Sequence, residues 1–316
     1  MKDVHQLSSA PRRESTSGQA PNALEATGLS KQYRKAWALR NASFAVPAGR
    51  VAALVGPNGS GKTTLLNMVV GLLSPTSGEV RVFGETVRQD AEVLSRVAFL
   101  AQDKPLYDSF TVAEMLKFGR VMNPRWDDEM ARRRLDELGI PLKRNVSRLS
   151  GGQQTQVGLT VAVAKRPHLL VLDEPLADLD PVARHEVTTS LMAAVAETAM
   201  TVLLSSHVVP DLVDTCDWLV VLNGGRVQVS GDIDDLLASH RMVVGPADGA
   251  ETVAGRLPVA ARSTSGRQAT LLLRGPASLP DPRWTERPVR LEDLVLTYLR
   301  DPDASALPAP SLIRAH

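Results

Sequence analysis

The chain has 316 residues, a formal net charge of +1 and 43% hydrophobic residues. These values are typical of a globular chain of about two domains, and a net charge near zero gives no general electrostatic case for nucleic-acid binding. Its one cysteine, Cys216, excludes an internal disulfide framework and a cysteine-rich zinc site.

The N-terminal residues 1–22 are rich in Ser, Pro, Arg and Gln, which is typical of a disordered tail. They lack the apolar core of a secretory signal. No stretch of the chain approaches the ~20 apolar residues that span a bilayer. We therefore expect a cytoplasmic protein whose membrane association would come through a partner.

Strands and helices alternate along residues 23–240. Short strands with turns are predicted over 24–55, and they end in the apolar strand Val51–Val55. A helix is predicted from about Lys62 to near Gly71, and a short strand at Val80–Phe83 follows. This order favours an α/β fold that begins with an antiparallel β subdomain.

Residues 104–150 differ from the rest, because their apolar residues have helical spacing. The segments Thr111–Phe118 and Asp127–Leu138 both show it, which predicts a helical subdomain inserted into the alternation. Afterwards the alternation resumes, which predicts a mainly parallel, covered sheet. The elements expected there are a helix from Ser150 to about Lys165, strand Leu169–Leu172, helix Val182–Glu197, strand Thr201–Leu204, helix Val208–Thr215 and a hairpin of Trp218–Leu222 with Arg226–Val229.

The C-terminal residues 241–316 are rich in Gly, Pro, Ala and Arg. Weak strand patterns occur at Met242–Val244 and Thr270–Leu273. The apolar residues of 291–299 fall on one face of a helix. We predict a small α+β accessory domain on which this helix packs, followed by a flexible end.

A phosphate-binding loop is predicted between the strand Val51–Val55 and the helix that follows it. The segment matches the pattern G-x-x-x-x-G-K-[ST]. Its glycines allow successive N–H groups to face one concavity, and the helix N-terminus adds positive charge. Lys62 can then reach the β- and γ-phosphates, and the Thr63 hydroxyl can bind Mg²⁺. The residues are Gly56, Pro57, Asn58, Gly59, Ser60, Gly61, Lys62 and Thr63.

Two carboxylates, Asp173 and Glu174, directly follow the apolar strand Leu169–Leu172. The strand places them at the carboxyl edge of the sheet, where open α/β folds bind ligands. Two adjacent acids alone are a weak signal. Downstream of a phosphate loop, Asp173 is predicted to hold Mg²⁺ and Glu174 to act as general base on the attacking water.

The pentapeptide Leu149–Gln153, LSGGQ, lies between these two motifs. Ser150 can cap a helix, and the two glycines leave backbone N–H groups open to an anion. With the phosphate loop and the acidic strand, this segment strongly resembles the nucleotide-binding subunit of ABC (ATP-binding cassette) transporters. The resemblance covers residues 24–238 and implies a P-loop NTPase that uses ATP and Mg²⁺.

The resemblance also implies a head-to-tail dimer in which one subunit's phosphate loop faces the other subunit's signature. Tyr33 matches the aromatic residue that stacks on adenine. Gln102 matches the glutamine near Mg²⁺ and the attacking water, and His207 matches the switch histidine at the γ-phosphate. The resemblance also implies that Thr64, next to the phosphate loop, contacts ATP. The residues that it implies act across the dimer are Ser150, Gly151, Gly152, Gln153 and Asp180.

The sequence departs from the family pattern at two places. The basic residues that commonly follow the signature are replaced by Gln154, Thr155 and Gln156, which puts the local contacts of the signature helix in doubt. Ala177 replaces the serine that usually begins the loop ending at Asp180. Neither change removes a predicted catalytic residue, so we expect the site to hydrolyse ATP.

The function expected from this resemblance is that of the ATPase subunit of a transporter, and of an exporter in particular. It would pair with a second ATPase subunit, identical or related, and with a membrane permease. Segment 104–148 would face the permease, and its expected apolar anchors are Pro105, Leu106, Tyr107 and Phe110.

Other classes of ATPase fit less well. A soluble regulatory cassette that is not coupled to transport stays open as an alternative. The short insertion excludes chromosome-type ATPases, the single cassette argues against translation factors, and the absence of a basic stripe argues against nucleic acid as a partner. A small-molecule kinase would not need the segment Leu149–Gln153.

Overall fold

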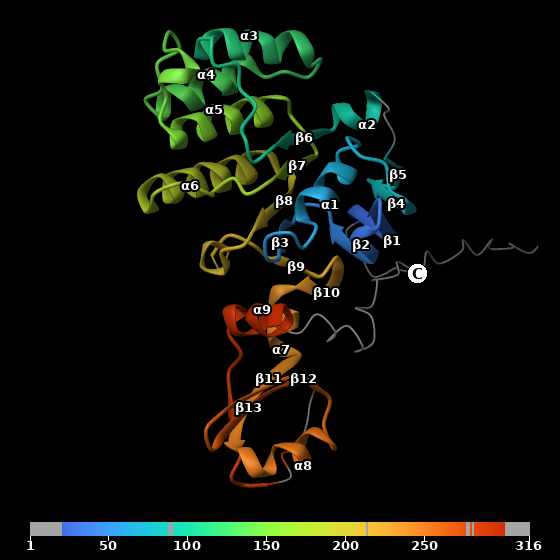
Figure 1. The fold of residues 1–316 in the computed structure, drawn as a ribbon. Helices are drawn as coiled ribbons and strands as arrows, with labels where there is room; N and C mark the ends of the chain where they lie inside the picture. The colour runs from blue at the N-terminus through green and yellow to red at the C-terminus, as the bar shows by residue number, and fades with distance from the viewer. Residues whose placement is uncertain (1–20, 88–90, 213, 276–278, 280, 301–316) are drawn as a thin grey trace, which may run out of the picture.

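The computed structural model describes residues 21–87, 91–212, 214–275, 279 and 281–300. In this part of the chain a helical layer lies at one end of the molecule, a central sheet lies in the middle, and the strands between residues 240 and 274 lie at the other end (Figure 1). The expectations for residues 1–20 and 301–316 fall outside the described residues. No helix among the described residues is long and apolar enough to cross a bilayer.

The first sheet is antiparallel, with the strand order β2-β1-β4-β5. Strands β1 and β2 have twelve residues each, so they are longer than the short strands expected from the sequence. Register shifts along β1 explain the difference, because each shift breaks the alternation of apolar and polar residues. The strands are β1 (Asn22–Tyr33), β2 (Ala36–Pro47), β4 (Ser77–Val82) and β5 (Glu85–Thr86).

The central sheet has six strands in the order β10-β9-β3-β8-β7-β6, and only β10 runs antiparallel to its neighbour. Four of its strands, β3, β7, β8 and β9, are buried at every residue. This burial confirms the predicted parallel sheet with both faces covered. The strands are β3 (Val51–Val55), β6 (Val97–Leu100), β7 (Leu169–Leu172), β8 (Thr201–Ser206), β9 (Trp218–Asn223) and β10 (Arg226–Asp232).

The two faces of the central sheet belong to two apolar cores. Alternate residues of one strand divide between them: Leu170 and Leu172 lie in the larger core, and Leu169 and Val171 lie in the other. Helix α1 (Lys62–Val69) packs in the second core with the antiparallel sheet. The larger core includes α6 (Pro181–Thr198) and the helical subdomain.

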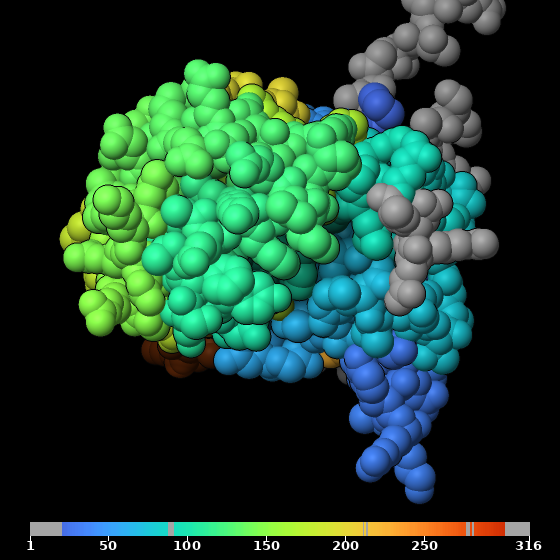
Figure 2. All heavy atoms as spheres, turned by 90° about the horizontal axis from the view of Figure 1, so that it is seen from above, coloured from blue at the N-terminus to red at the C-terminus, as the bar shows by residue number. Residues whose placement is uncertain are grey.

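The helical subdomain stands beside the β subdomain when the molecule is viewed from above (Figure 2). A capping box fixes the start of α3, because Thr111 and Glu114 bond each other's backbone N–H groups. The helices are α3 (Val112–Met122), α4 (Asp128–Glu137) and α5 (Gly151–Ala164), and shorter pieces are α2 (Ala91–Ser95) and η1 (Val146–Arg148).

The helix predicted over Val208–Thr215 is wrong. The described residues form a single 3-10 turn, η2 (Val209–Leu212), and residues 214 and 215 lie in a turn. The apolar spacing of the segment is real, because Val209 and Leu212 are buried in the larger core. One turn is enough to bury both side chains, so the spacing does not require a longer helix.

The C-terminal extension contains a sheet with the strand order β12-β13-β11-β14. One face of this sheet has its own small core, in which Trp284 and Val253 pack on Leu271 and Leu273. The elements are α7 (Ile233–Ala238), β11 (His240–Pro246), η3 (Ala247–Gly249), α8 (Ala250–Ala254), β12 (Val259–Ser265), β13 (Gln268–Arg274), β14 (Thr285–Arg287) and α9 (Leu291–Arg300).

Helix α9 packs against the cassette as well as against the extension. Its residues Leu294, Val295 and Tyr298 belong to the larger core together with Leu219 of β9. The Asn223 side-chain amide at the end of β9 donates to the carbonyls of Tyr298 and Leu299, at 3.3 and 2.8 Å. The predicted helix is therefore present, and it joins the extension to the central sheet.

The buried His240 is hydrogen-bonded to the side-chain hydroxyl of Tyr298. Its Nδ1 donates to the Leu236 carbonyl at 2.7 Å, so its Nε2, 2.8 Å from the Tyr298 hydroxyl, accepts from that group. Burial lowers the pKa of His240 and raises that of Tyr298. Both groups are therefore neutral near pH 7, as a hydrogen bond between neutral groups requires.

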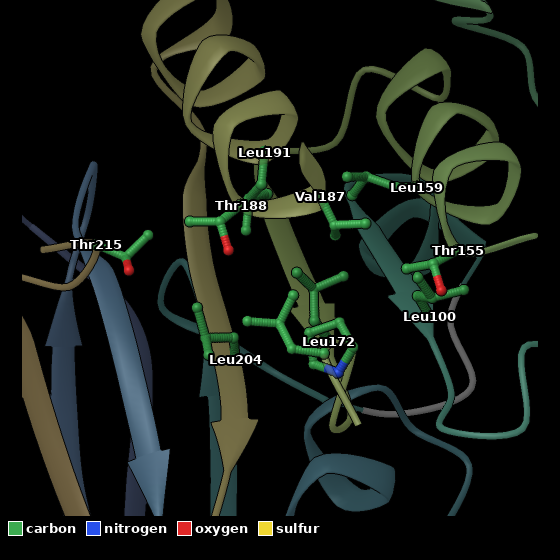
Figure 3. Close-up of a pocket in the computed structure, with 11 residues that line it drawn as sticks. Leu100, Thr155, Leu159, Leu172, Val187, Thr188, Leu191, Leu204 and Thr215 are labelled. Atoms are coloured by element: carbon green, nitrogen blue, oxygen red, sulfur yellow. The ribbon is translucent and has the colours of Figure 1, made fainter. Parts of the chain in front are cut away.

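A small apolar cavity of about 10 Å³ lies beneath the acidic pair, between α5, α6 and the ends of three strands (Figure 3). Side chains of both helices point into it, among them Leu159, Val187 and Leu191. Its size and apolar lining exclude a nucleotide. We expect Leu191→Ala to enlarge this space and to lower the free energy of unfolding by about 2–5 kcal/mol. Urea denaturation measures the change.

A control on the same helix is Val182→Ala. Val182 is 68% exposed, so its replacement is expected to change stability by less than about 0.5 kcal/mol. Equal losses for the two variants would show that the packing around Leu191 is not the cause.

Candidate active site

The phosphate loop joins β3 to α1, as the sequence predicts, and two of its glycines allow unusually close backbone contacts. A Cβ on Gly61 would lie 2.5 Å from the carbonyl oxygen of Ala38, and φ at this residue is +105°. A Cβ on Gly56 would lie 2.3 Å from the carbonyl oxygen of Leu222. These positions need glycine because any side chain would push the loop out of its concave shape.

The loop forms one wall of an open cavity of about 470 Å³. The opposite wall comes from the ends of β6, β7 and β8, so the cavity brings together five of the predicted groups: the phosphate loop, Thr64, Gln102, Glu174 and His207. Its size and the start of α1 in its wall suit a nucleoside triphosphate. The lining residues are Ala38, Asn58, Gly59, Gly61, Lys62, Thr63, Thr64, Gln102, Glu174, Ala177, Asp178 and His207.

The predicted general base lies between two nitrogen donors. Lys62 Nζ is 3.1 Å from Glu174 Oε1 and also donates to the Gly56 carbonyl at 2.8 Å. His207 Nδ1 is 2.8 Å from Glu174 Oε2 and donates to it. Lys62 and Glu174 are 6% and 8% exposed, whereas His207 is 45% exposed. The carboxylate therefore has a partner at each oxygen, and His207 is the partner that solvent can reach.

Asp173 lies one residue before Glu174 and is 2% exposed. Its Oδ1 accepts a hydrogen bond from Ser205 Oγ at 2.7 Å. The hydroxyl of Thr63 is on the exposed start of α1, at the same cavity. One carboxylate and one hydroxyl suit Mg²⁺, which protein sites usually hold together with substrate phosphates and water.

The described residues contain no group of three or more His, Cys, Asp or Glu side chains that could hold a metal by themselves. Gln102, the third predicted magnesium contact, is exposed at the end of β6 and lines the cavity.

The signature segment does not line this cavity. Ser150 caps α5 in a reciprocal capping box with Gln153, in which each side chain accepts from the other residue's N–H at 3.2 Å. Gly151 is exposed, and its backbone N–H is at the start of the helix. A signature that faces solvent is open to a second subunit.

Tyr33 and Asp180 also lie outside the cavity lining, as do Asp173 and three residues of the phosphate loop, Gly56, Pro57 and Ser60. Tyr33 is at the end of β1 with its ring 48% exposed, and Lys31 Nζ lies 5.4 Å from the ring centroid. Asp180 caps α6 and accepts from the N–H groups of Val182 and Ala183 at 2.9 and 3.0 Å. Their predicted roles toward adenine and across a dimer stay predictions.

Two of the three unusual residues after the signature are buried, and the third, Gln154, is half-buried and donates to the Val146 carbonyl at 3.2 Å. Thr155 is fully buried and donates to the Gly151 carbonyl. Gln156 is 4% exposed, and neither atom of its side-chain amide has a hydrogen-bond partner among the described residues. A buried amide without partners is destabilising, and none of the three residues lines the cavity.

Sequence reasoning missed three residues of this region. Ala38 and Asp178 line the cavity, and Ser205 contacts both members of the acidic pair. Nothing about the residue types of Ala38 and Asp178 indicates that they line a nucleotide site. Ser205 is indicated by its residue type, because it is a serine that directly follows the apolar run Val202–Leu204 in β8.

Comparisons with known proteins agree with this geometry. A family profile described as "ABC transporter" matches residues 39–177. An uncharacterized ABC transporter ATP-binding protein of Bacillus subtilis, YxlF, is 36% identical over 218 residues, which cover 67% of this chain and 72% of that protein. The Nod factor export ATP-binding protein I of Sinorhizobium fredii is 33% identical over 296 residues, covering 87% of this chain and 85% of that protein.

Importer subunits are also similar. The sulfate/thiosulfate import ATP-binding protein CysA 2 of Chromobacterium violaceum is 31% identical over 295 residues, with 90% of this chain and 78% of that protein covered. Among solved structures, an ATP-binding subunit of an ABC transporter superposes with a TM-score of 0.61 at 28% identity over 68% of this chain and 92% of its own. The profile, the full set of motifs and the shared fold lead to one conclusion: the chain belongs to the ABC transporter family as an ATP-binding subunit, and this family hydrolyses ATP.

Proposed function

We propose that the residues gathered in the cavity between the phosphate loop and the strand ends carry out ATP hydrolysis in this chain. Backbone N–H groups of the phosphate loop, together with Lys62, would hold the β- and γ-phosphates. Glu174 would accept the proton of the attacking water, and His207, at its Oε2, would orient that carboxylate and contact the γ-phosphate. Gln102 would position the water from the opposite wall.

Thr63 and Asp173 would hold Mg²⁺ with the nucleotide, and the cation would supply charge stabilisation at the phosphates. Lys62 now bonds Glu174, so on ATP binding its ammonium would exchange this carboxylate for phosphate oxygens. That exchange frees Glu174 Oε1 to accept a proton. The binding of ATP would therefore bring Lys62 to the phosphates and at the same time free Glu174 to act as general base.

We further propose that two such subunits pair head to tail, with ATP between the phosphate loop of one and the signature of the other. The proposal is supported by the exposed signature helix start, which lies away from the chain's own cavity. Asp180, at the start of α6, would link the two sites. Closure is then the bistable step that ATP favours.

The proposed cellular role is to power a separate membrane permease from the inner face of the membrane, in the direction of export. The similarity to the Nod factor export protein, which is 33% identical over 296 residues, supports this direction. The similarity to sulfate/thiosulfate importers makes import the competing direction.

A cluster of exposed apolar side chains is the proposed permease contact. The rings of Tyr107 and Phe118 lie 5.3 Å apart on the helical subdomain, and Phe110 is 4.9 Å from Tyr107. Leu106, one of the expected anchors, packs against the larger core instead of facing solvent. The contact would therefore be carried by aromatic rings of α3 and of the segment just before it.

The test is a tagged pull-down from native membranes in mild detergent, followed by mass spectrometry. We expect a stoichiometric polytopic protein to copurify, and Tyr107→Ser to reduce its yield while ATP binding is unchanged. Vesicles that hold the pair with the cassette outside, given ATP and a cell extract, should accumulate a compound inside if the direction is export. Recovery of the chain without any membrane protein would instead favour a regulatory ATPase, and loss of a preloaded compound would favour import.

A further inference from the structure

The side chain of Ser205 connects the two acidic residues of the proposed hydrolytic site. Ser205 is fully buried at the end of β8, next to β7 in the central sheet. Its Oγ is 2.7 Å from Asp173 Oδ1 and 2.8 Å from the backbone nitrogen of Glu174. One hydroxyl therefore contacts two consecutive residues of the neighbouring strand end.

The directions of the two hydrogen bonds follow from the chemistry of the groups. A carboxylate can only accept, so Ser205 donates its single hydrogen to Asp173. A backbone N–H can only donate, so Glu174 gives its hydrogen to Ser205 Oγ. The hydroxyl is thus used as donor and acceptor at once, and neither alanine nor valine can replace it.

The backbone of Glu174 shows why this second bond matters. Its φ is +49°, in the left-handed region that residues other than glycine seldom adopt. Such a conformation persists only where surrounding contacts hold it. The bond to Ser205 holds the nitrogen of Glu174, while Lys62 and His207 hold the two carboxylate oxygens.

We propose that Ser205 is a positioning residue for hydrolysis, which fixes the Asp173 carboxylate and the strained backbone of Glu174 relative to each other. The inference rests on the roles proposed above for Asp173 and Glu174. Ser205 itself touches no reacting atom. It acts by keeping the metal-binding oxygen and the general base in a constant arrangement across the end of β7.

The test compares Ser205→Ala, Ser205→Thr and a control, Thr201→Val. Thr201 is on the same strand, is 2% exposed, and its hydroxyl likewise accepts a backbone N–H, from Gly49 at 2.9 Å. It lies at the opposite end of β8, so Thr201→Val loses a similar bond away from the site. Steady-state ATPase kinetics and the affinity for a fluorescent ATP analogue, with Mg²⁺ and in EDTA, are measured for each variant.

We expect Ser205→Ala to lower kcat by about 10- to 100-fold, because small misplacements of catalytic groups have effects of this size. Nucleotide affinity in EDTA should stay within about threefold of the parent, because the phosphate loop is unchanged, and affinity with Mg²⁺ should fall. Ser205→Thr keeps the hydroxyl and should recover most of kcat. Thr201→Val should keep the parental kcat at a comparable melting temperature.

The proposal is overturned if Ser205→Ala keeps the parental kcat, or if Thr201→Val lowers kcat as much. If Ser205→Thr misfolds, the alanine variant and its control still decide the question. Glu174→Gln distinguishes a failure of the proposed hydrolytic site from a failure of the role proposed for Ser205. Full turnover in that variant would refute the proposed site itself, whereas lost turnover together with an active Ser205→Ala would refute only the role of Ser205.

Discussion

Glu174→Gln is expected to reduce ATP turnover about 10²- to 10⁴-fold, the contribution typical of a general base. Glutamine has nearly the same shape as glutamate and keeps an oxygen for His207 or Lys62, but it cannot take up the proton of the attacking water. ATP binding should persist and strengthen, because Lys62 no longer has a buried carboxylate 3.1 Å away that competes with the phosphates. Release of inorganic phosphate and titration with a fluorescent ATP analogue measure the two effects.

The same variant should accumulate closed dimers with ATP, visible by gel filtration. Their head-to-tail arrangement can be tested with Asn58→Cys on one tagged chain and Arg148→Cys on another. Asn58 is an exposed residue of the phosphate loop, and Arg148 is an exposed residue directly before the signature, so a disulfide should form between unlike chains only with ATP. Burial raises the pKa of the native Cys216 thiol to about 12, which keeps it protonated and slow to react.

Parental turnover in Glu174→Gln would contradict the general-base role. Asp178→Asn is a matched control, because it also neutralises a carboxylate that lines the cavity but has no assigned catalytic part. We expect it to change turnover far less. A disulfide between two chains that both carry Asn58→Cys would contradict the head-to-tail arrangement.

Lys62→Ala is expected to weaken ATP binding by about 10- to 100-fold, since hydrogen bonds to charged groups contribute about 1.5–3 kcal/mol. The loss has two physical sources. The phosphates lose their ammonium partner, and Glu174, which is 8% exposed, keeps its charge close to them without the compensating Lys62. Titration with the fluorescent analogue, without turnover, measures the change.

Two further variants make this result interpretable. Lys143→Ala removes an equal charge from an exposed position outside the cavity and should leave the affinity unchanged. The double variant Lys62→Ala with Glu174→Gln removes both partners, so it should bind ATP better than Lys62→Ala alone. Unchanged affinity in Lys62→Ala would refute the assignment of the phosphate loop.

Much of the central sheet could be predicted from the sequence, because its strands are apolar on both faces. Runs such as Leu169–Leu172 have no other stable location than a covered sheet. The phosphate loop and the acidic pair were located for a related reason: each directly follows such a strand. Where alternation is broken by register shifts, as in β1, the lengths of the strands were underestimated.

The contacts between side chains of the site were much harder to predict. The sequence places Lys62, Glu174 and His207 at the ends of three separate elements, but it contains no information on which atoms meet. Ser205 was missed because its partners are on a neighbouring strand, about thirty residues away in the chain. The predicted helix over Val208–Thr215 is longer than the observed turn Val209–Leu212, because the spacing of apolar residues indicates which of them are buried but not how long the helix is.

The C-terminal extension is attached to the cassette at two places. The chain enters it through β10 and α7, and it returns through α9, which packs on β9 and is bonded by Asn223. A module joined by one linker can swing freely, whereas two attachments leave it little freedom to move alone. A ligand or protein that displaced the extension would therefore also turn β9. This strand runs parallel to β3, which leads into the phosphate loop, so α9 packs on the strand next to the one that carries the loop.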